Sequence, residues 1–369
     1  MKLTVIIPIY NRSRMLVQAL NSLHWQTYKN FTVIVADDAS SENLQEVVEQ
    51  FPSLNIAYHR FDENLGQFQN AMRGASLCQT DFMKFLYSDD LLFPDALELQ
   101  IKALEEMPES SICLGSYIEF EEVSDKKEIA IYKTLAPYIP ASRSSSQWAK
   151  LENFNCFFPS ACMYRTGIFH KIGGFNTTLS GIGDWELYVA LSFKYPVVAT
   201  DSVVCAMRLH PDQVTQKFFL NADSLQIKDV IWMTSKDNPY RERLNLPIIQ
   251  QIFLRHQIFW RLLRMGIVSD DDFFQLLIKW LKIAISSKML TSLVLSFPFF
   301  LAAHFLRKAR QRSGFQKAIN IDVDNYKLMI ETLLFSTKDQ QNIRDTENFF
   351  EPQMISEIDH ISISCSEPS

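Results

Sequence analysis

Adjacent carboxylates follow two apolar runs in this 369-residue chain. The run Phe82–Tyr87 leads into Ser88-Asp89-Asp90, and the run Phe31–Ala36 leads into Asp37-Asp38. Neighbouring aspartates are poor core residues, but their oxygens are good ligands for a hard divalent cation such as Mg²⁺ or Mn²⁺. A structural role is the alternative, because Asp90 precedes Leu91-Leu92-Phe93-Pro94 and aspartate is a favoured helix N-cap.

Two further polar groups have the residue types of a functional site. Pro8-Ile9-Tyr10-Asn11-Arg12 closes the first apolar run, and Gly183-Asp184-Trp185-Glu186 opens a helical pattern. The structural alternatives are a core position for Tyr10 and a helix cap for Asp184. For Glu186 we favour a solvated helix position, since glutamate is rarely buried unless it is paired.

The elements that must position these residues alternate along the chain. Apolar runs predict strands, and amphipathic stretches between them predict helices. The expected strands are 3–9, 31–36, 55–60, 82–87 and 112–120, and the expected helices are 13–25, 41–51, 67–77 and 94–107. This alternation predicts an α/β fold, a doubly wound and mostly parallel sheet with flanking helices. Ligands of such open sheets bind outside the carboxyl ends of the strands, where the polar groups above would meet.

The chemistry of that sheet edge follows from what it contains and lacks. The sequence has neither G-x-G-x-x-G nor G-x-x-x-x-G-K-[ST], so neither a dinucleotide fingerprint nor a P-loop explains the sheet. An edge rich in carboxylates repels phosphate unless a cation bridges the two. A nucleoside diphosphate held by Mg²⁺ or Mn²⁺ therefore suits it.

Composition limits the other possibilities. The formal net charge is −6, which does not suggest a nucleic-acid partner. The six cysteines include no C-x-x-C pair, so we expect reduced thiols and a cytoplasmic location. The start of the chain, Met1 to Thr4, leads directly into a strand and lacks the pattern of a signal peptide.

An ordered set of motifs resembles family 2 glycosyltransferases, which are inverting enzymes of the GT-A fold. The resemblance covers about residues 1–220. In many family members the position of Tyr87 is acidic. The motifs in chain order are Val5-Ile6-Ile7-Pro8-Ile9-Tyr10-Asn11-Arg12, Ser22-Leu23-His24-Trp25-Gln26-Thr27-Tyr28, Val35-Ala36-Asp37-Asp38-Ala39-Ser40, Asn64-Leu65-Gly66, Ser88-Asp89-Asp90, Gly173-Gly174-Phe175-Asn176, Gly183-Asp184-Trp185-Glu186-Leu187 and Arg208-Leu209-His210-Pro211-Asp212-Gln213-Val214-Thr215.

The resemblance implies a role for each matching residue. Pro8 and Tyr10 would line a nucleobase pocket, and Asp38 would accept the imide N–H of a uracil-type base. Asp37 is the less certain member of that pair, with a turn role as its alternative. Asp89 would contact the ribose, and Asp90 would bind Mg²⁺ or Mn²⁺ on the diphosphate. Asp184 would be the general base, and His210 would steady the diphosphate or the acceptor loop.

The C-terminal part has a different character. We expect a boundary near residue 220, a helical region over 221–320 that associates with membranes, and a partly disordered tail over 321–369. The segment 289–306 has no charged residue and is followed by Arg307, Lys308, Arg310 and Arg312. It could be a buried hairpin or a membrane span, but we favour an interfacial helix at the inner membrane face.

These observations predict a metal-dependent enzyme. It would move a sugar, with a UDP-sugar as the expected donor, to a hydroxyl of a glycan or lipid-linked acceptor. The alternative is a non-catalytic module that binds sugar nucleotides or glycans on the same scaffold. A nucleotidyltransferase is a weaker third option, since the chain lacks a Gly-rich, basic phosphate loop after its first strand.

Overall fold

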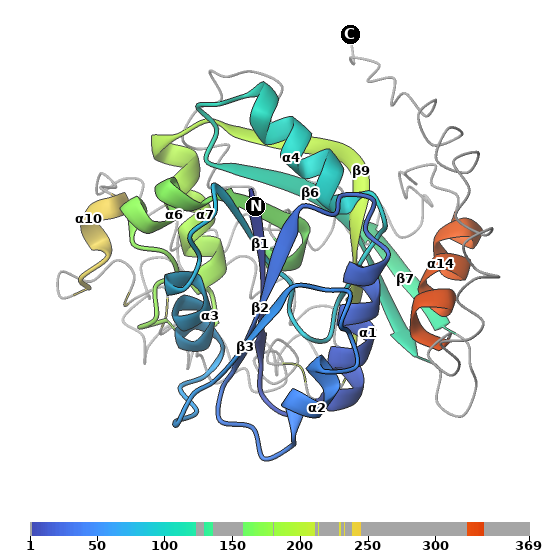
Figure 1. The fold of residues 1–369 in the computed structure, drawn as a ribbon. Coiled ribbons are helices and arrows are strands. Elements are labelled where there is room, and N and C mark those ends of the chain that lie inside the picture. The colour runs from blue at the N-terminus through green and yellow to red at the C-terminus, as the bar shows by residue number, and fades with distance from the viewer. Residues whose placement is uncertain are drawn as a thin grey trace, which may run out of the picture.

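A single mixed sheet with helices on both faces organises the part of the chain that the structure describes (Figure 1). The structure is a computed structural model. It describes residues 2–122, 129–135, 158–179, 181–210, 213, 229, 232, 238–244 and 323–335. The predicted α/β class is confirmed.

The strands and helices follow the predicted alternation closely. The strands are β1 (Leu3–Ile9), β2 (Phe31–Asp37), β3 (Ile56–Arg60), β4 (Phe82–Phe85), β5 (Leu91–Leu92), β6 (Ile112–Glu122), β7 (Ile129–Leu135), β8 (Cys162–Arg165) and β9 (Val197–Arg208). The helices are α1 (Ser13–His24), α2 (Leu44–Val48), α3 (Gln67–Ser76), α4 (Ala96–Glu106), the short 3-10 helix η1 (Pro159–Ala161), α6 (Thr166–Ile172), α7 (Gly183–Lys194), α10 (Arg241–Leu244) and α14 (Val323–Phe335).

The order of the strands explains why the polar groups can meet. Neighbouring strands follow the order β3-β2-β1-β4-β8-β6-β9-β5, and β7 pairs with β6. The strands β3, β2, β1 and β4 are parallel, so their carboxyl ends lie at one edge. Beyond them β8 runs antiparallel to β4 and β6, which makes the sheet mixed.

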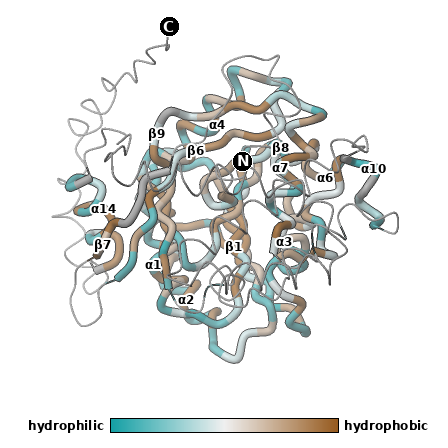
Figure 2. The backbone as a smooth tube through the Cα atoms, turned by 180° about the vertical axis from the view of Figure 1, so that it is seen from behind, coloured by the Kyte–Doolittle hydropathy of each residue, from teal (hydrophilic) through white to brown (hydrophobic). Residues whose placement is uncertain are grey.

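Each face of the sheet has its own apolar core. All seven residues of β1 are buried, as expected for a central strand covered on both sides. One face packs under α1, α2 and α4, and the other packs under α3, α6 and α7. Figure 2 shows the apolar character of the central strands, with polar stretches towards the outside. Gly74 of α3 lets that helix approach β1, since a Cβ there would lie 2.6 Å from a methyl carbon of Ile6.

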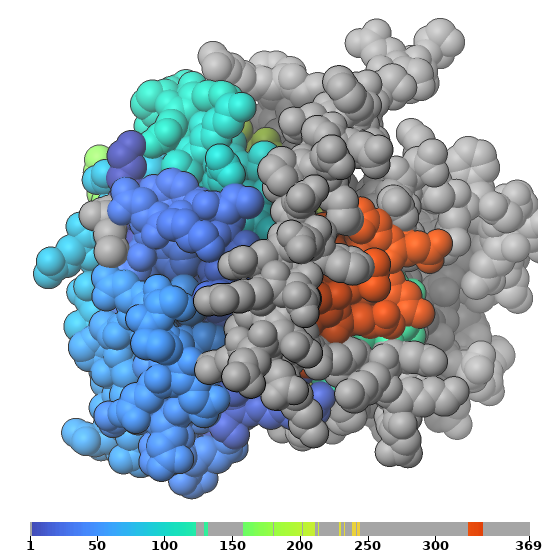
Figure 3. Space-filling model, turned by 45° about the vertical axis from the view of Figure 1, so that its right-hand side comes forward, coloured from blue at the N-terminus to red at the C-terminus, as the bar shows by residue number. Residues whose placement is uncertain are grey.

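Helix α14, from the region predicted as a tail, packs on the sheet domain. Its buried residues Ile330, Leu333 and Leu334 share an apolar cluster with β5, β6, β7 and β9. Gln18 of α1 donates a hydrogen bond to the carbonyl of Leu334 at 3.3 Å. Figure 3 shows the outer side of α14, in orange, at the surface of the molecule.

Some predictions from the sequence differ from the structure, and one concerns residues outside the described part of the chain. The helix expected over 41–51 is confined to α2. The helix after the acid pair begins at Ala96 with Asp95 at its N-cap, so the interpretation of Asp90 as a helix cap is wrong. The segment 289–306 lies outside the described residues, and within those residues no helix is long and apolar enough to cross a membrane. The division at residue 220 stays a prediction.

Candidate active site

The loops after β1 and β2 are bound to each other. Asn11 and Arg12 in the first loop and Ala39 in the second have positive φ angles, 56°, 68° and 61°, which non-glycine residues adopt rarely. The backbone N–H of Asn11 donates to Oγ of Ser40 at 2.7 Å, and Oδ1 of Asn11 accepts from the N–H of Ser41 at 2.9 Å. These bonds fix the two loops in one arrangement despite the backbone strain.

Pro8 and Tyr10 occupy different environments at the end of β1. Pro8 is buried and in register with Ala36 of β2. It lies beyond the last β1–β4 pair, Ile6 with Phe85, where a proline without an N–H interrupts no pairing on that side. Tyr10 is 49% exposed, so the alternative of a core aromatic is wrong. Its ring is available to a ligand.

Asp37 is a structural residue of the β2 turn. Its Oδ1 accepts from the backbone N–H of Ser40 at 2.9 Å, and its Oδ2 accepts from the hydroxyl of Tyr58 at 2.6 Å. Burial and this carboxylate together raise the pKa of Tyr58 above its usual value. Both oxygens of Asp37 are therefore occupied inside the fold, as its turn role predicts.

Asp38 holds the turn that precedes α3. Its Oδ1 accepts from the N–H of Leu65 at 3.0 Å and its Oδ2 from the N–H of Gly66 at 2.9 Å. Gly66 has a φ of +84°, which a glycine adopts without strain. Arg73 of α3 pairs with Oδ1 of the same carboxylate. A carboxylate has about four acceptor positions, so three such bonds leave room for one further donor, on Oδ2.

Asp89 lies between the side chains of Arg12 and His210. Its Oδ2 is 3.1 Å from Nη1 of Arg12 and 3.1 Å from Nε2 of His210. Burial alone would raise the pKa of the Asp89 carboxyl, but the His210 hydrogen bond and the Arg12 charge outweigh burial and lower it. The side chain is 14% exposed. Asp89 is thus an ionised carboxylate that a ligand can reach.

Asp90 is a deeply buried neighbour with different properties. Its Oδ2 accepts from the hydroxyl of Ser160 at 2.6 Å, and its Oδ1 lies 3.4 Å from the backbone nitrogen of Arg208. Burial, followed by the nearby charge of Asp89, raises the pKa of Asp90 well above its usual value. The pKa values of the two adjacent aspartates are therefore shifted in opposite directions.

Tyr87 connects the acid pair with Asp184. Its hydroxyl is buried and has no hydrogen-bond partner among the described residues. Burial raises the pKa of Tyr87, and the charges of Asp184, Asp89 and Asp90 raise it further, so all three carboxylates are near enough to act on it electrostatically. Tyr164 of β8 has a second buried hydroxyl without a partner in the described part of the chain, and Asp184 also raises its pKa, after burial.

Asp184 lies in the first turn of α7. Ile182, and not Asp184, occupies the N-cap position. Oδ1 of Asp184 accepts from the N–H of Trp185 at 2.7 Å. The positive end of the helix dipole favours an ionised carboxylate at this position.

Arg208, at the end of β9, bonds to two other parts of the site, and no role was predicted for it from the sequence. Its Nε donates to the carbonyl of Asp89 at 3.0 Å, and its Nη2 donates to Oε1 of Gln18 at 2.7 Å. It also pairs with Glu122. Burial lowers the pKa of Arg208 to about 10, so it stays charged at neutral pH. Its motif, Arg208 to Thr215, was the only signal in the sequence.

The acid pair could bind a divalent cation that is also bound by a diphosphate. Among the described residues, no group of three or more His, Cys, Asp or Glu side chains could hold a metal ion by itself. Mg²⁺ commonly binds through one or two protein carboxylates and completes its shell with phosphate oxygens and water. Asp89 is ionised and partly exposed, and Asp90 is its direct neighbour, so the two carboxylates could share such a cation.

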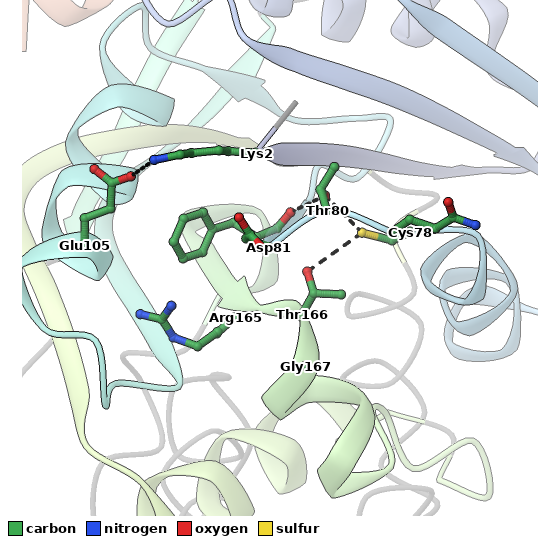
Figure 4. Close-up of a pocket in the computed structure, with 10 residues that line it drawn as sticks. Lys2, Cys78, Thr80, Asp81, Glu105, Arg165, Thr166 and Gly167 are labelled. Atoms are coloured by element: carbon green, nitrogen blue, oxygen red, sulfur yellow. Dashed lines mark hydrogen bonds and ion pairs between the residues drawn. The ribbon is translucent and has the colours of Figure 1, made fainter.

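A cavity of about 510 Å³ lies at the other edge of the parallel strands and contains none of the predicted site residues. Figure 4 shows Lys2, Thr80 and Asp81, which come from the starts of β1 and β4, facing Arg165 and Thr166. Lys2 pairs with Glu105 at 2.7 Å, and Arg165 donates to the carbonyls of Ser110 and Leu104. These cations already have partners, so the cavity is not a competing candidate.

Comparisons with known proteins concern mainly the first half of the chain. The family model described as Glycosyl transferase family 2 matches residues 4–173, a range that includes Pro8, Tyr10, Asp38, Asp89 and Asp90 and ends before Asp184. YwdF of Bacillus subtilis, described as an uncharacterized glycosyltransferase, is 24% identical over 53% of this chain and 70% of that protein. An uncharacterized glycosyltransferase of Rickettsia conorii is 26% identical over 58% of this chain. The match spans about a third of that relative, 35% of its length.

Solved structures with some likeness include two sugar-nucleotide complexes. S. aureus TarS 1-349 in complex with UDP-GlcNAc has a TM-score of 0.48 and 16% identity, covering 72% of this chain and 81% of that one. The mannosyltransferase PcManGT from Pyrobaculum calidifontis, in complex with GDP-Man and Mn²⁺, has a TM-score of 0.46 and 14% identity. That match covers 81% of this chain and 87% of the other.

Proposed function

Residues 4–173 belong to glycosyl transferase family 2, with the GT-A fold that the sequence predicted, and on that premise we propose an inverting sugar transfer. The donor is a nucleotide-diphosphate sugar, with a UDP-sugar preferred. The acceptor is a hydroxyl group of a glycan or of a lipid-linked molecule.

The acid pair Asp89-Asp90 follows β4, and Asp184 in the first turn of α7 acts electrostatically on the neighbouring Tyr87, which is the observation that carries this proposal. The reaction needs a group that holds the leaving diphosphate and a base that acts on the acceptor. The acid pair at the end of β4 supplies the first, and the first turn of α7 supplies the second. Because the acid pair and Asp184 are both near Tyr87, one substrate could contact both.

Asp184 acts as the general base in this scheme. Its carboxylate removes the proton of the acceptor hydroxyl as that oxygen attacks the anomeric carbon. The bond between this carbon and the diphosphate oxygen breaks in the same displacement, and the nucleoside diphosphate leaves with the electron pair. A single displacement inverts the configuration at the anomeric carbon.

The loops after β1, β2 and β4 bind the nucleotide. The exposed ring of Tyr10 stacks on the base beside Pro8. Asp38 uses its remaining acceptor position for the imide N–H of the base. Asp89 binds the ribose, and His210, through Asp89, steadies the diphosphate side of the site.

Asp90, together with Asp89, would hold Mg²⁺ or Mn²⁺. When bound, the cation neutralises charge on the leaving diphosphate. The pKa of Asp90 is raised, so it must lose its proton to bind the metal. We therefore expect metal binding to this pair to weaken at low pH.

A donor screen tests the proposed function. Purified protein with Mn²⁺ is incubated with UDP- and GDP-sugars, and release of the nucleoside diphosphate is measured with and without candidate acceptors. We expect release with at least one donor, loss of release with EDTA, and loss in Asp90→Ala. Saturable donor binding with no release under any acceptor would favour the non-catalytic module instead.

We also propose that the acceptor lies at the inner face of a membrane, to which this protein binds. This proposal rests on the uncharged segment 289–306 and the basic residues that follow it. Sedimentation with anionic vesicles tests it. We expect co-sedimentation that weakens when Arg307, Lys308, Arg310 and Arg312 are replaced by glutamine, and equal sedimentation of both proteins would contradict it.

A further inference from the structure

Three residues beyond the matched family region hold the segment that leads into α7. We call Asp229, Trp232 and Arg243 the clamp. They follow β9, and in Figure 1 helix α10, which contains Arg243, lies beside α6 and α7. The family match ends at residue 173, so neither the clamp nor α7 belongs to it.

Arg243 makes the strongest contacts of the clamp. Its Nε donates to Oε1 of Glu186 at 2.9 Å, and its Nη2 pairs with Oε2 of the same carboxylate. Its Nη1 donates to the carbonyls of Ile172 at 3.1 Å and Gly174 at 2.7 Å. One guanidinium thus joins the end of α6 to the first turn of α7. A bidentate pair of this kind fixes orientation as well as distance.

The pair is almost completely removed from solvent. The side chain of Glu186 is 0% exposed and that of Arg243 is 7% exposed. The guanidinium also lies over the ring of Tyr240, 4.6 Å from its centre. The expectation that Glu186 is a solvated helix residue is therefore wrong. Loss of either partner would leave the other charge buried and unpaired, which is strongly unfavourable.

The other two clamp residues hold the loop between α6 and α7. Oδ2 of Asp229 accepts from the backbone N–H of Gly181 at 2.7 Å. Nε1 of Trp232 donates to Oγ1 of Thr178 at 2.7 Å. The loop is thus held at two points between Gly174 and Asp184. Gly174 itself has a φ of +62° and lies against Met72, since a Cβ there would come within 2.4 Å of its sulfur.

We propose that the clamp is a positioning device for the base Asp184, with Arg243 as its principal positioning residue. Glu186 and Asp184 share the first turn of α7, so the bond that fixes Glu186 also fixes the backbone from which Asp184 projects. The inference rests on the proposed function. It extends that function by making the segment after β9 part of the catalytic machinery. A small displacement of a catalytic group lowers turnover far more than it lowers binding of a donor held elsewhere.

The test compares Arg243→Met, Glu186→Gln and the double variant with the wild-type full chain. Arg165→Met is the matched control, because Arg165 also donates to two backbone carbonyls and lies over an aromatic ring, that of Phe82, but at the other edge of the sheet. The double variant removes both charges, so it tests the proposal even if a single variant does not fold.

We expect kcat of the Arg243 and Glu186 variants to fall about 10- to 100-fold. KM for the donor should change less than about threefold, since the donor site lies on other loops. Arg165→Met should keep the wild-type kcat. A folded double variant with wild-type kcat would overturn the proposal, and so would an equal loss in Arg165→Met.

Hydrogen exchange of the backbone amides of 183–187 gives a readout that needs no activity. We expect faster exchange there in Arg243→Met than in Arg165→Met. If the wild-type protein transfers no sugar, the proposed function fails, and this comparison alone decides whether the clamp holds α7. Unchanged exchange in Arg243→Met would overturn the clamp.

Discussion

The imidazole Nε2 of His210 lies 3.1 Å from Oδ2 of Asp89, although 121 positions separate the two residues in the chain. The contact brings the end of β9 to the end of β4. It also explains how a buried carboxyl keeps a lowered pKa, because His210 and Arg12 together offset the effect of burial. The acid pair and the His210 motif therefore form one site.

Replacement of His210 by phenylalanine tests this link. The variant keeps a ring of similar shape but removes the nitrogen that contacts Asp89. A lost hydrogen bond to a charged group costs about 1.5–3 kcal/mol, so we expect the donor KM to rise roughly tenfold or more. Steady-state kinetics with varied donor measures it. His24→Phe is the control, since His24 contacts Ser53 on the exposed side of α1. A KM within twofold of wild type would contradict the link.

Asp90→Asn should stabilise the metal-free protein at neutral pH while it lowers transfer. The folded-state pKa of Asp90 is raised well above its usual value, so ionisation costs the folded state stability as pH rises above about 4. Asparagine stays neutral throughout. We expect the variant to be more stable than wild type at pH 7, because burial and the charge of Asp89 raise the pKa of Asp90.

Urea denaturation in EDTA measures that gain between about pH 3.5 and 7.5, a range that starts near the usual aspartate pKa. The difference between the proteins should shrink towards zero at the acid end. A variant less stable than wild type at pH 7 would show that the Asp90 carboxylate is a net stabilising group.

Lys84 provides a second pH-dependent prediction, away from the substrate. Its amine is fully buried in β4, where it donates to Oε1 of Gln100 at 2.8 Å, and burial lowers its pKa to about 8. The lowered pKa means that the protonated amine of Lys84 destabilises the folded state. The penalty is complete below about pH 8 and disappears towards the unfolded pKa of about 10.4.

The stability of wild type relative to Lys84→Met should therefore rise with pH by roughly 3 kcal/mol between neutral pH and about pH 10. Chemical denaturation of both proteins across that range measures the difference, and methionine serves as the non-titrating reference. Parallel pH profiles of the two proteins would contradict a titrating, buried amine at this position.

Tyr87→Phe removes a buried hydroxyl that has no partner in the described part of the chain. An unsatisfied buried polar group costs about 1–3 kcal/mol, so we expect the ligand-free variant to be more stable by roughly that amount. We also expect kcat to fall about tenfold, the order of one lost hydrogen bond, because the carboxylates that act on Tyr87 electrostatically are those proposed to hold the diphosphate and the acceptor.

Tyr164→Phe is the matched comparison for this prediction. Both hydroxyls are buried and without a partner in the described part of the chain, but Tyr164 is buried as a whole residue whereas Tyr87 is partly exposed. Thermal unfolding should show similar gains for both variants, with a loss of kcat for Tyr87→Phe alone. Equal kcat values for both variants and wild type would remove Tyr87 from the site.

The sequence predicted the parallel half of the fold because its signals are local. The buried strands β1, β2 and β4 are short apolar runs, and each is followed by polar residues that can only lie at the sheet edge. The antiparallel strand β8 has four residues, and its pairing with β4 and β6 depends on partners far along the chain. No local periodicity reports that pairing.

The same distinction explains the errors within the site. Asp89 and Asp90 are adjacent in the sequence, so the acid pair could be recognised there. Their partners Ser160, Arg208 and His210 come from distant segments of the chain. Glu186 has a helical pattern that favours solvent, and only Arg243, 57 positions away, makes its burial possible. A charged residue whose partner lies far along the chain is therefore predicted at the surface, because the local sequence pattern does not contain the partner.

The central claim is that Asp184 is the base of a sugar transfer, and Asp184→Asn tests it most directly. The change keeps the shape and removes the proton acceptor. Donor affinity is measured by titration, and turnover by release of the nucleoside diphosphate in the presence of acceptor. Asp81→Asn, an exposed aspartate at the other edge of the sheet, is the control. We predict an unchanged donor Kd and a kcat lowered about 10²- to 10⁴-fold, whereas a kcat equal to that of wild type would contradict the assignment.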